Sequence, residues 1–323
     1  MSNITINQHY IPQCILTNFS NDKEQVYECL VNKKKIYPTN IEFSMTSRYT
    51  YEHPFFETNK IEKWFGKIES YTGPAIKKII CTIENYEIDK SEFKNIKDLV
   101  NSYLTTFIVF YYRSGALLHE YEFQQNNKNN RILSMTDKLM NSKYIRNLCK
   151  SIIQNYNFAI LKSEQNNFLL SDQFISTAAL SIKNKFYNIS NRHMGLKDII
   201  ILIPISKNYY AAYYDGEIPE YIVQNRINKL NKQQVNEINK VIINNSYIKC
   251  VSNEKESLEH SLNEFYFSSP QEIISSYTDG QYSGVKLKKE VFFYYRDQKA
   301  WELITSYHYD WDIYDDVGRN DLC

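Results

Sequence analysis

The chain lacks an excess of charge of either sign. Its 323 residues include 38 Lys and Arg against 37 Asp and Glu, which gives a formal net charge of +1 with neutral histidines. A protein that holds nucleic acid through bulk positive charge is therefore excluded, whereas a local basic patch is compatible with this balance. The apolar fraction of 43% and the 28 tyrosines are ample for a folded core, so the composition does not indicate disorder.

The sequence also lacks the features of secreted and membrane proteins. The start MSNITINQHY has neither the charged nor the apolar region of a signal peptide, and the apolar stretches at 103–112 and 199–205 are too short to cross a bilayer. The cysteines are scattered and form no C-x-x-C pair: Cys14, Cys29, Cys81, Cys149, Cys250 and Cys323. Such thiols are typical of a reducing compartment. We therefore expect a soluble cytoplasmic protein with no membrane partner.

Familiar catalytic motifs are missing as well. The sequence contains no glycine-rich phosphate loop, no G-x-S-x-G elbow and no H-E-x-x-H metal site. It also has no internal repeat of fixed period. Function must therefore be inferred from individual residues and from their predicted places in the fold.

The apolar periodicity predicts an α+β fold. Helical spacing recurs in the segments 56–83, 99–112, 132–156 and 233–245. Gly73-Pro74 is expected to break the first of these segments into two helices. Short apolar runs predict strands at 158–162, 168–170, 199–205 and 209–214, and a hairpin at 25–37. We expect a central helical region, an antiparallel sheet formed mainly by the second half, and a small N-terminal hairpin. Residues 1–252 would form the core domain, and 253–323 an extension packed on it.

The N-terminal segment has a composition that is unusual for a chain terminus. Termini are disordered unless something ties them down, but this one has the apolar side chains to dock on a core: Ile4, Ile6, Tyr10, Ile11, Ile15, Leu16 and Phe19. It also presents His9, whose ordinary pKa lies near neutrality. We expect a docked segment that delivers His9 to a site as a general base, an orienting donor or a metal ligand. The alternative is that the segment only hydrogen-bonds neighbouring backbone.

Two further candidates, Arg113 and Asp172, stand at the ends of apolar segments. The guanidinium of Arg113, at the end of the helix 99–112, suits a carboxylate or phosphate, unless it pairs with the helix terminus or an acidic neighbour. Asp172 follows the predicted strand 168–170 and Ser171, where sites often lie. Asp172 could instead cap a helix that begins near Phe174.

Arg113 and His119 together form an R-x5-H spacing, which resembles the signature of the helical HEPN ribonucleases. On a continuous helix, six residues rotate by about 600° and place the two side chains on different faces. A break at Gly115 would restore the geometry. The predicted strands of the second half argue against a HEPN fold for the whole chain.

Glu62 and Glu69 are seven residues apart on the first predicted helix and therefore project from one face. Inward carboxylates of this kind could hold a divalent cation. The other interpretation is a solvated stripe, since the intervening apolar residues carry the burial.

Several segments in a fixed order carry a family resemblance. They are the opening NQHYIPQCILTNFS, the hairpin VYECLVNKKKIY, the helix IEKWFGKIES with GPAIKKI, the helix end FIVFYYRS, the turn FLLSDQFI, the strand ILIPISKNYYAAYY and the helix VNEINKVIINNSYIKCVS. Together, over residues 3–252, they resemble the bacterial family called domain of unknown function 4238. The resemblance implies an ordered arrangement of His9, Arg113 and Asp172, but no reaction. Where the family has a proline soon after Ser-Asp, this chain has Gln173 and Phe174 after Ser171-Asp172.

The last six residues, GRNDLC, resemble the start of the SEC-C zinc motif. That motif continues into further cysteine or histidine ligands, whereas here Cys323 is the last residue given. One thiolate does not complete a four-ligand zinc site, so zinc binding is not expected.

The first functional hypothesis is a hydrolase, and specifically a nuclease-like effector in anti-phage defence or a toxin system, by association with bacterial accessory genes. His9 would act as acid or base, Arg113 as phosphate or oxyanion clamp, and Asp172 as orienter or metal ligand. Gln8, Tyr10 and Ser171 would contact substrate. A divalent cation could take part, and the partners would be nucleic acid or a nucleotide and a protein from the same defence locus.

The competing hypothesis is a binding or sensor module without chemistry. The tyrosine-rich strand at 209–214 and the segment Phe292–Tyr295 would then present an aromatic recognition surface. This hypothesis predicts an exposed aromatic groove and a fully satisfied, apolar environment for His9.

Overall fold

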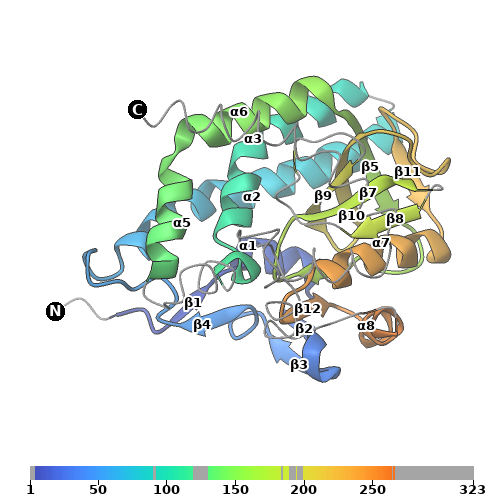
Figure 1. Cartoon of the computed structure of the whole chain (residues 1–323). Helices are drawn as coiled ribbons and strands as arrows, with labels where there is room; N and C mark the ends of the chain where they lie inside the picture. The colour runs from blue at the N-terminus through green and yellow to red at the C-terminus, as the bar shows by residue number, and fades with distance from the viewer. Residues whose placement is uncertain are drawn as a thin grey trace, which may run out of the picture.

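A six-stranded sheet, a four-stranded sheet, a two-stranded sheet and the helices around them make up the described part of the fold, shown as a computed structural model in Figure 1. The structure describes residues 4–89, 92–118, 130–182, 185–188, 194, 199–263 and 265. Some predicted features lie outside these residues: His119, the aromatic segment Phe292–Tyr295 and the C-terminal GRNDLC.

The helices of the first half follow the predicted apolar periodicity. α2 (Lys60–Asp89) and α3 (Phe93–Tyr112) pack on each other, and the last turns of α3 are buried all round, as expected for a central helix. The segment 132–156 forms two helices, α5 (Asn130–Met140) and α6 (Ser142–Asn155). In the described part of the chain, no helix combines the length and the hydropathy needed to cross a membrane.

The predicted break at Gly73-Pro74 is wrong, because α2 continues through both residues as one helix. A proline inside a helix removes one backbone hydrogen bond. Side chains buried on both sides of Pro74, such as Ile68 and Ile76, offset that loss. Gly73 serves packing instead: a Cβ there would lie 3.4 Å from Cβ of Cys14, so the missing side chain lets the N-terminal segment approach α2.

The second half of the chain forms a six-stranded sheet in the order β11-β5-β10-β9-β7-β8. Neighbouring strands are antiparallel, except that β11 runs parallel to β5. The strands are β5 (Asn157–Ser163), β7 (Ser176–Ile182), β8 (Lys185–Asn188), β9 (Ile199–Ser206), β10 (Tyr209–Asp215) and β11 (Ile227–Leu230). The prediction of an α+β fold with a sheet from the second half is confirmed.

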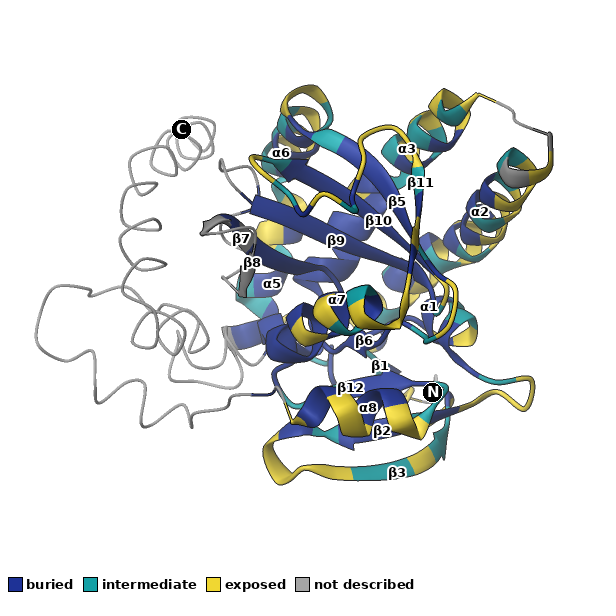
Figure 2. Ribbon diagram, turned by 90° about the vertical axis from the view of Figure 1, so that its right-hand side faces the viewer, coloured by how far each residue is buried: buried dark blue, intermediate teal, exposed yellow. Residues whose placement is uncertain are grey.

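Alternate tyrosines of β10 reach the layers on the two faces of this sheet. The Tyr213 hydroxyl donates to Oδ1 of Asn101 in α3 at 2.8 Å, whereas the Tyr210 hydroxyl donates to the Leu169 carbonyl at 2.6 Å. α7 (Lys232–Asn245) lies on the Leu169 side and contacts β6 and β7. Figure 2 shows α2, α3 and α6 on the opposite side from α7.

The predicted hairpin is part of a four-stranded sheet rather than a separate unit. β2 (Gln25–Leu30) and β3 (Lys35–Asn40) pair with each other, and strands from the second half extend them in the order β3-β2-β12-β6. The added strands are β12 (Lys249–Ser252) and β6 (Leu170–Ser171). Two distant parts of the chain therefore share one sheet.

The carboxylate of Glu28 secures this sheet from within. It is buried and accepts hydrogen bonds from the Tyr37 hydroxyl, from Ser44 Oγ at 2.8 Å and from the Met45 amide at 3.2 Å. Lys249 Nζ of β12 pairs with it at 2.7 Å. A buried charge with this many partners has its desolvation offset, so Glu28 holds β12, the hairpin and the following loop together.

The N-terminal segment is docked, as predicted, although its strand was not anticipated. β1 (Asn7–His9) pairs antiparallel with β4 (Thr46–Arg48), and the short helical turns α1 (Gln13–Leu16) and η1 (Thr17–Phe19) follow. The segment's apolar side chains from Tyr10 onward, which include Ile11, are buried in the core. The segment is therefore an integral part of the fold.

α8 (Lys255–Leu262) packs on α7, β12 and the hairpin strands. The first residues of the predicted C-terminal extension therefore contact the core. The rest of that extension lies outside the described residues, apart from Phe265, which is buried.

The close approach of Tyr10 to Gly115 generates a stability prediction. A Cβ at Gly115 would lie 2.7 Å from ring atoms of the buried Tyr10, so Gly115→Ala should lower the free energy of unfolding by about 1–3 kcal/mol. Gly66, in α2, has no such neighbour, so Gly66→Ala should raise it by about 0.5–1 kcal/mol. Urea denaturation of both variants checks this. Equal stability of Gly115→Ala and the wild type would show that Tyr10 is not held there.

Candidate functional site

Arg113 is the centre of the candidate site and is only 1% exposed. It follows α3 as its C-cap residue. Its Nη1 donates to Oε1 of Glu69 at 2.6 Å, its Nε donates to the Tyr51 hydroxyl at 3.2 Å, and its Nη2 donates to the backbone carbonyl of His9. We call Arg113, Glu69, Tyr51 and the His9 carbonyl the Arg113 cluster. Every nitrogen of the guanidinium is engaged inside the protein.

Aromatic rings complete the surroundings of Arg113. The guanidinium carbon lies 4.0 Å from the centroid of the Phe65 ring and 5.4 Å from that of Tyr51. Such contacts favour a desolvated cation. Because its donors are already engaged and its surface is covered, Arg113 is placed to hold α2, α3 and β1 together. A phosphate would have to displace these partners before it could bind there.

The backbone and the side chain of His9 have separate roles. The carbonyl belongs to the Arg113 cluster, and it also accepts from the Tyr51 hydroxyl at 3.1 Å. The half-buried imidazole has its Nε2 3.0 Å from the Ile41 carbonyl. Because a carbonyl can only accept, a neutral ring bonded to Ile41 has its proton on Nε2 and its lone pair on Nδ1; the Gln13 amide nitrogen, 3.4 Å from the same Nε2, then does not donate to it. Burial lowers the pKa of His9, although the bond to Ile41 and the carboxylate of Glu69 oppose the shift.

The second titratable group of this region is the Glu62 carboxyl. It lies in the first turn of α2, and its buried Oε2 has no hydrogen-bond partner among the residues that the structure describes. Burial raises the pKa of Glu62 to about 7; Arg113 opposes this shift, while Glu69 and Glu52 add to it. A carboxyl with such a pKa is half-protonated at neutral pH and can therefore exchange a proton there.

The structure corrects the interpretation of Glu62 and Glu69 as a solvated stripe. Both side chains are half-buried and lie near Arg113. Among the residues that the structure describes, no group of three or more His, Cys, Asp or Glu side chains is arranged to hold a metal ion. The roles that these two carboxyl groups have are therefore electrostatic: Glu69 pairs with Arg113, and Glu69 and Arg113 both act on the pKa of Glu62.

Asp172 lies close to the N-terminal segment but has a different set of partners. Its carboxylate is 1% exposed and accepts from the backbone amides of Tyr247 at 2.6 Å, Ile248 at 2.7 Å and Lys249 at 2.9 Å. Its carbonyl accepts from the Ala116 amide at 3.2 Å. Asp172 thus joins the helical turn after α3 to the start of β12. The helix expected near Phe174 does not form, because the chain continues after the Asp172 turn into β7.

The turn that carries Asp172 closes without the family's proline. Ser171 Oγ accepts from the Gln173 amide at 3.0 Å, and the Ser171 carbonyl accepts from Phe174 at 3.0 Å. Phe174 has a φ of 69°, a left-handed conformation that is unfavourable for an aromatic residue. Its ring packs on Phe107 and Phe110 of α3, which holds that conformation in place.

The predicted substrate-contacting residues are buried. Gln8 is 0% exposed; its side chain accepts from the Tyr51 amide at 2.7 Å and donates to Glu52 at 3.0 Å. Tyr10 is 7% exposed, and Ser171 is 0% exposed. The structure therefore gives Gln8 and Ser171 internal partners, and it brings His9 and Arg113 together while Asp172 faces another loop.

The tyrosine-rich strand predicted as a recognition surface is buried, so that part of the binding-module hypothesis is wrong. All tyrosines of β10 belong to the core, because both faces of its sheet are covered: Tyr209, Tyr210, Tyr213 and Tyr214. Alternation alone could not show that both faces are covered.

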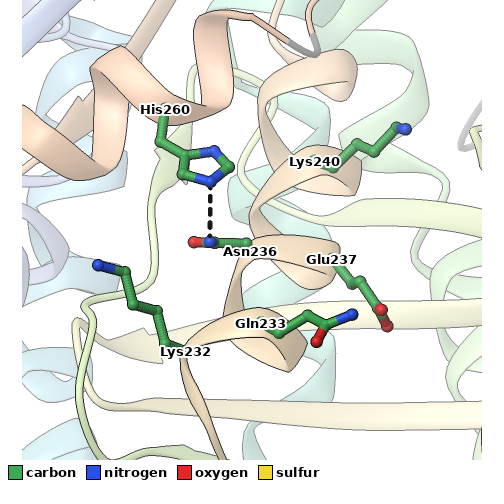
Figure 3. A pocket seen from close by; sticks show the side chains of 6 residues that line it. All are labelled: Lys232, Gln233, Asn236, Glu237, Lys240 and His260. Carbon is green, nitrogen blue, oxygen red and sulfur yellow. Dashed lines mark hydrogen bonds between the residues drawn. The ribbon is translucent and has the colours of Figure 1, made fainter.

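Two other features, the Cys14 thiol and a hollow on α7 and α8, do not bring together groups suited to catalysis. Burial raises the pKa of Cys14, beside Gly73, to about 12, so its thiol is not a ready nucleophile. A hollow of about 520 Å³ on α7 and α8 is lined by Lys232, Gln233, Asn236, Glu237, Lys240 and His260. Figure 3 shows the ammonium groups of Lys232 and Lys240 pointing to opposite sides.

Sequence reasoning missed Tyr51 and Glu52 as members of this region. Both lie in an irregular loop, where periodicity offers no signal. The seven-residue spacing of Glu62 and Glu69 did signal a shared face. That this face points toward Arg113 follows only from the packing of α2 on α3.

Arg113 generates the second stability prediction. Arg113→Met keeps the length of the side chain but removes the charge, so the Glu69 carboxylate loses its cation and the His9 carbonyl keeps only the Tyr51 hydroxyl as a donor within the described residues. We expect the free energy of unfolding to fall by about 3–5 kcal/mol, as when a buried ion pair loses one partner. Arg146→Met on α6, where the exposed arginine bonds only to Ser142, should change it by less than about 0.5 kcal/mol. Similar losses in both variants would contradict a special role for Arg113.

Comparison with known proteins bears on the family. The family model described as "Protein of unknown function (DUF4238)" matches residues 7–256, a span that contains His9, Glu62, Arg113 and Asp172. No curated protein and no solved structure matches the chain. Because the family match covers well over half of the sequence, the chain belongs to the DUF4238 family.

Proposed function

We propose that the chain is a hydrolase in which His9 and Glu62 act as base and acid. The observation that carries this proposal is the position of both half-buried side chains near the same Arg113–Glu69 ion pair. Burial lowers the pKa of His9 and raises that of Glu62 to about 7, and both residues feel the charges of Arg113 and Glu69. Just below neutral pH, His9 is therefore neutral while Glu62 keeps its proton. Two groups with such shifts have the protonation states that acid–base catalysis needs.

The proposed mechanism moves one proton at each residue. Nδ1 of His9 takes a proton from a water molecule as the water oxygen attacks the substrate, while Nε2 stays bonded to the Ile41 carbonyl. The Glu62 carboxyl donates its proton to the leaving group. The imidazolium and the carboxylate that result are opposite in charge, and each returns to its starting form by exchange with solvent.

The Arg113–Glu69 ion pair has an indirect role in this proposal. Arg113 stabilises the ionised form of Glu62, whereas Glu69 and Glu52 oppose it. The balance of these effects with burial leaves the pKa of Glu62 at about 7. Arg113 and Asp172 thus position the chain around the site, and neither needs to touch the substrate.

Nucleic acid or a nucleotide is the proposed substrate class. Among the described residues, the charges that act on the Glu62 carboxyl are those of Arg113, Glu69 and Glu52, so three carboxyl groups stand against one cation there. Because this excess of acidic groups disfavours a bare phosphate, the substrate would enter with a divalent cation bound to it. A role in anti-phage defence or as a toxin, with a protein partner from the same locus, is part of the same proposal.

The mechanism predicts a bell-shaped pH–rate profile. Purified protein is incubated with single-stranded RNA, single-stranded DNA, duplexes and nucleoside triphosphates, each with Mg²⁺, Mn²⁺ or neither. The rate should rise as His9 loses its proton below pH 6.5 and fall as Glu62 loses its own near pH 7. His9→Gln should abolish the rising limb and Glu62→Gln the falling limb, each with a loss of about 10²–10⁴-fold in kcat.

Two variants control for indirect effects in this assay. His260→Gln changes an exposed histidine on α8, and Glu84→Gln changes an exposed glutamate on α2, so both should behave like the wild type. His9→Gln keeps the backbone carbonyl that Arg113 binds, so it tests the side chain alone. Wild-type rates in both His9→Gln and Glu62→Gln, or no hydrolysis of any substrate by the wild type, would refute the proposal.

The pKa of Glu62 also predicts a pH-dependent stability. Burial favours the protonated form, so this contribution is complete below the ordinary pKa of about 4.5 and is lost as the pH rises through about 7. Glu62→Gln mimics the protonated form. We expect it to match the wild type at pH 5 and to exceed it by about 1 kcal/mol at pH 8, after allowance for partial solvent screening. Urea denaturation at both pH values, with Glu84→Gln as control, measures the difference; equal stability at pH 8 would contradict the burial argument.

A further inference from the structure

We infer that the outer face of α2 binds the phosphate backbone of nucleic acid. The face is a stripe of exposed lysines, Lys60, Lys63, Lys67, Lys77 and Lys78, with the 51%-exposed Tyr71 among them. We call these five lysines and Tyr71 the α2 stripe. This inference deepens the proposed function by locating the surface that would hold a nucleic-acid substrate, and only its link to hydrolysis rests on that proposal.

Helical geometry aligns the α2 stripe. At 100° per residue, Lys60, Lys67 and Lys78 fall within about 20° of one line along the helix, and Lys63 and Lys77 lie about 60° and 100° to one side of that line. At about 1.5 Å per residue, the stripe from the first lysine to the last is about 27 Å long, which matches about eight base pairs of a duplex. Figure 2 shows α2 at the edge of the molecule, with exposed residues along its outer side.

The stripe has no acidic counterpart on its own face. Between Lys60 and Lys78, the only acidic residues are Glu62 and Glu69, which lie about 180–200° around the helix from Lys60 and are half-buried toward Arg113. None of the five lysines is in an ion pair within the part of the chain that the structure describes. The local charge is therefore strongly positive although the net charge of the chain is +1.

The chemistry of the stripe favours nucleic acid over an anionic membrane. Binding to a membrane surface requires large apolar side chains along the helix, next to its basic residues. Here the exposed residues between the lysines are small or polar apart from Tyr71, such as Gly66, Ser70 and Pro74, and the half-buried Trp64 packs against the core. Exposed Tyr71 offers a ring on which a base can stack. Lysines that neutralise phosphates and an aromatic ring that stacks are the two components of single-strand binding.

One end of the stripe lies in the same helical turn as a residue of the proposed hydrolytic site. Lys60 and Lys63 flank Glu62 in the first turn of α2, about 200° and 100° around the helix from it. A strand bound along the outer face would have to bend around this end of α2 to bring a phosphate to Glu62. The lysines would attract the polyanion, which the carboxyl groups around Arg113 alone would repel.

The test measures binding without turnover. Fluorescence anisotropy measures the binding of wild-type protein, in EDTA, to three labelled probes. The probes are a single-stranded RNA of 20 nucleotides, a duplex of the same sequence, and vesicles of phosphatidylserine. We expect the logarithm of the single-strand affinity to fall with that of the salt concentration with a slope of about −3.5, as for five phosphate contacts. In Lys63→Gln/Lys67→Gln/Lys78→Gln, the affinity should fall by at least about tenfold and the slope should approach about −1.5.

Matched variants separate the stripe from bulk charge and from folding. Lys33→Gln/Lys34→Gln/Lys35→Gln removes the same charge from the exposed turn of the β2–β3 hairpin and should leave the affinity unchanged. Tyr71→Ala should weaken single-strand binding by about fivefold and duplex binding little, because stacking needs an unpaired base. Glu62→Gln should bind like the wild type whether or not the protein is a hydrolase.

The outcomes of this test and of the hydrolysis assay are distinguishable. Loss of affinity in the stripe variant without any hydrolysis by the wild type supports the binding surface and refutes the proposed function. Equal affinity of the stripe and hairpin variants, or binding to phosphatidylserine vesicles without binding to RNA or DNA, overturns the nucleic-acid surface. Hydrolysis that depends on Glu62 could persist in either case.

Discussion

A desolvated guanidinium has to satisfy all of its donors inside the protein, and the arrangement around Arg113 follows from that requirement. Its partners come from parts of the chain that are far apart: Glu69 of α2, Tyr51 of a loop, and the carbonyl of His9 in β1. Removing any of these partners would leave a buried cation or a buried acceptor unpaired, at a cost of several kcal/mol. The N-terminal segment therefore docks where Arg113 needs an acceptor, and it brings the His9 imidazole to the edge of the same region.

The ion pair also determines the chemistry that the region can perform. Because Arg113 is paired with the carboxylate of Glu69, it offsets the effect of burial on the pKa of Glu62 only in part. In the part of the chain that the structure describes, one oxygen of the half-buried Glu62 carboxyl has no hydrogen-bond partner, and the carboxyl is half-protonated near pH 7. A structural requirement thus produces a titrating group near neutrality. The same helix turns its lysines outward, so α2 presents an acidic inner face and a basic outer face.

Much of the fold follows from periodicity, because helix α3 and strands β9 and β10 are apolar enough to be recognised locally. The Gly73-Pro74 break was wrong because packing on both sides of the proline outweighs one lost hydrogen bond. Docking of the N-terminus followed from its apolar residues, but the pairing of β1 with β4 depends on contacts 40 residues apart, about which a local pattern carries no information.

The candidate site could be predicted only in part. The sequence singled out His9, Arg113 and Asp172, and the structure joins the first two. The partners of Arg113 and Asp172 include backbone groups, which any residue type supplies and which therefore leave no trace in composition. The role of Glu62 depends on its burial beside Arg113, which the spacing of the two glutamates indicates but does not specify.

Native-state hydrogen exchange tests the central claim that the N-terminal segment is part of the cooperative core. The Tyr10 amide donates to the Met45 carbonyl at 3.1 Å, and the Tyr51 amide donates to Gln8 at 2.7 Å. If Arg113 holds this segment, both amides should exchange only through global unfolding, with the same free energy as the Ile160 amide of β5. Exchange of Tyr10 and Tyr51 through local opening, at a free energy several kcal/mol below that of Ile160, would contradict the account.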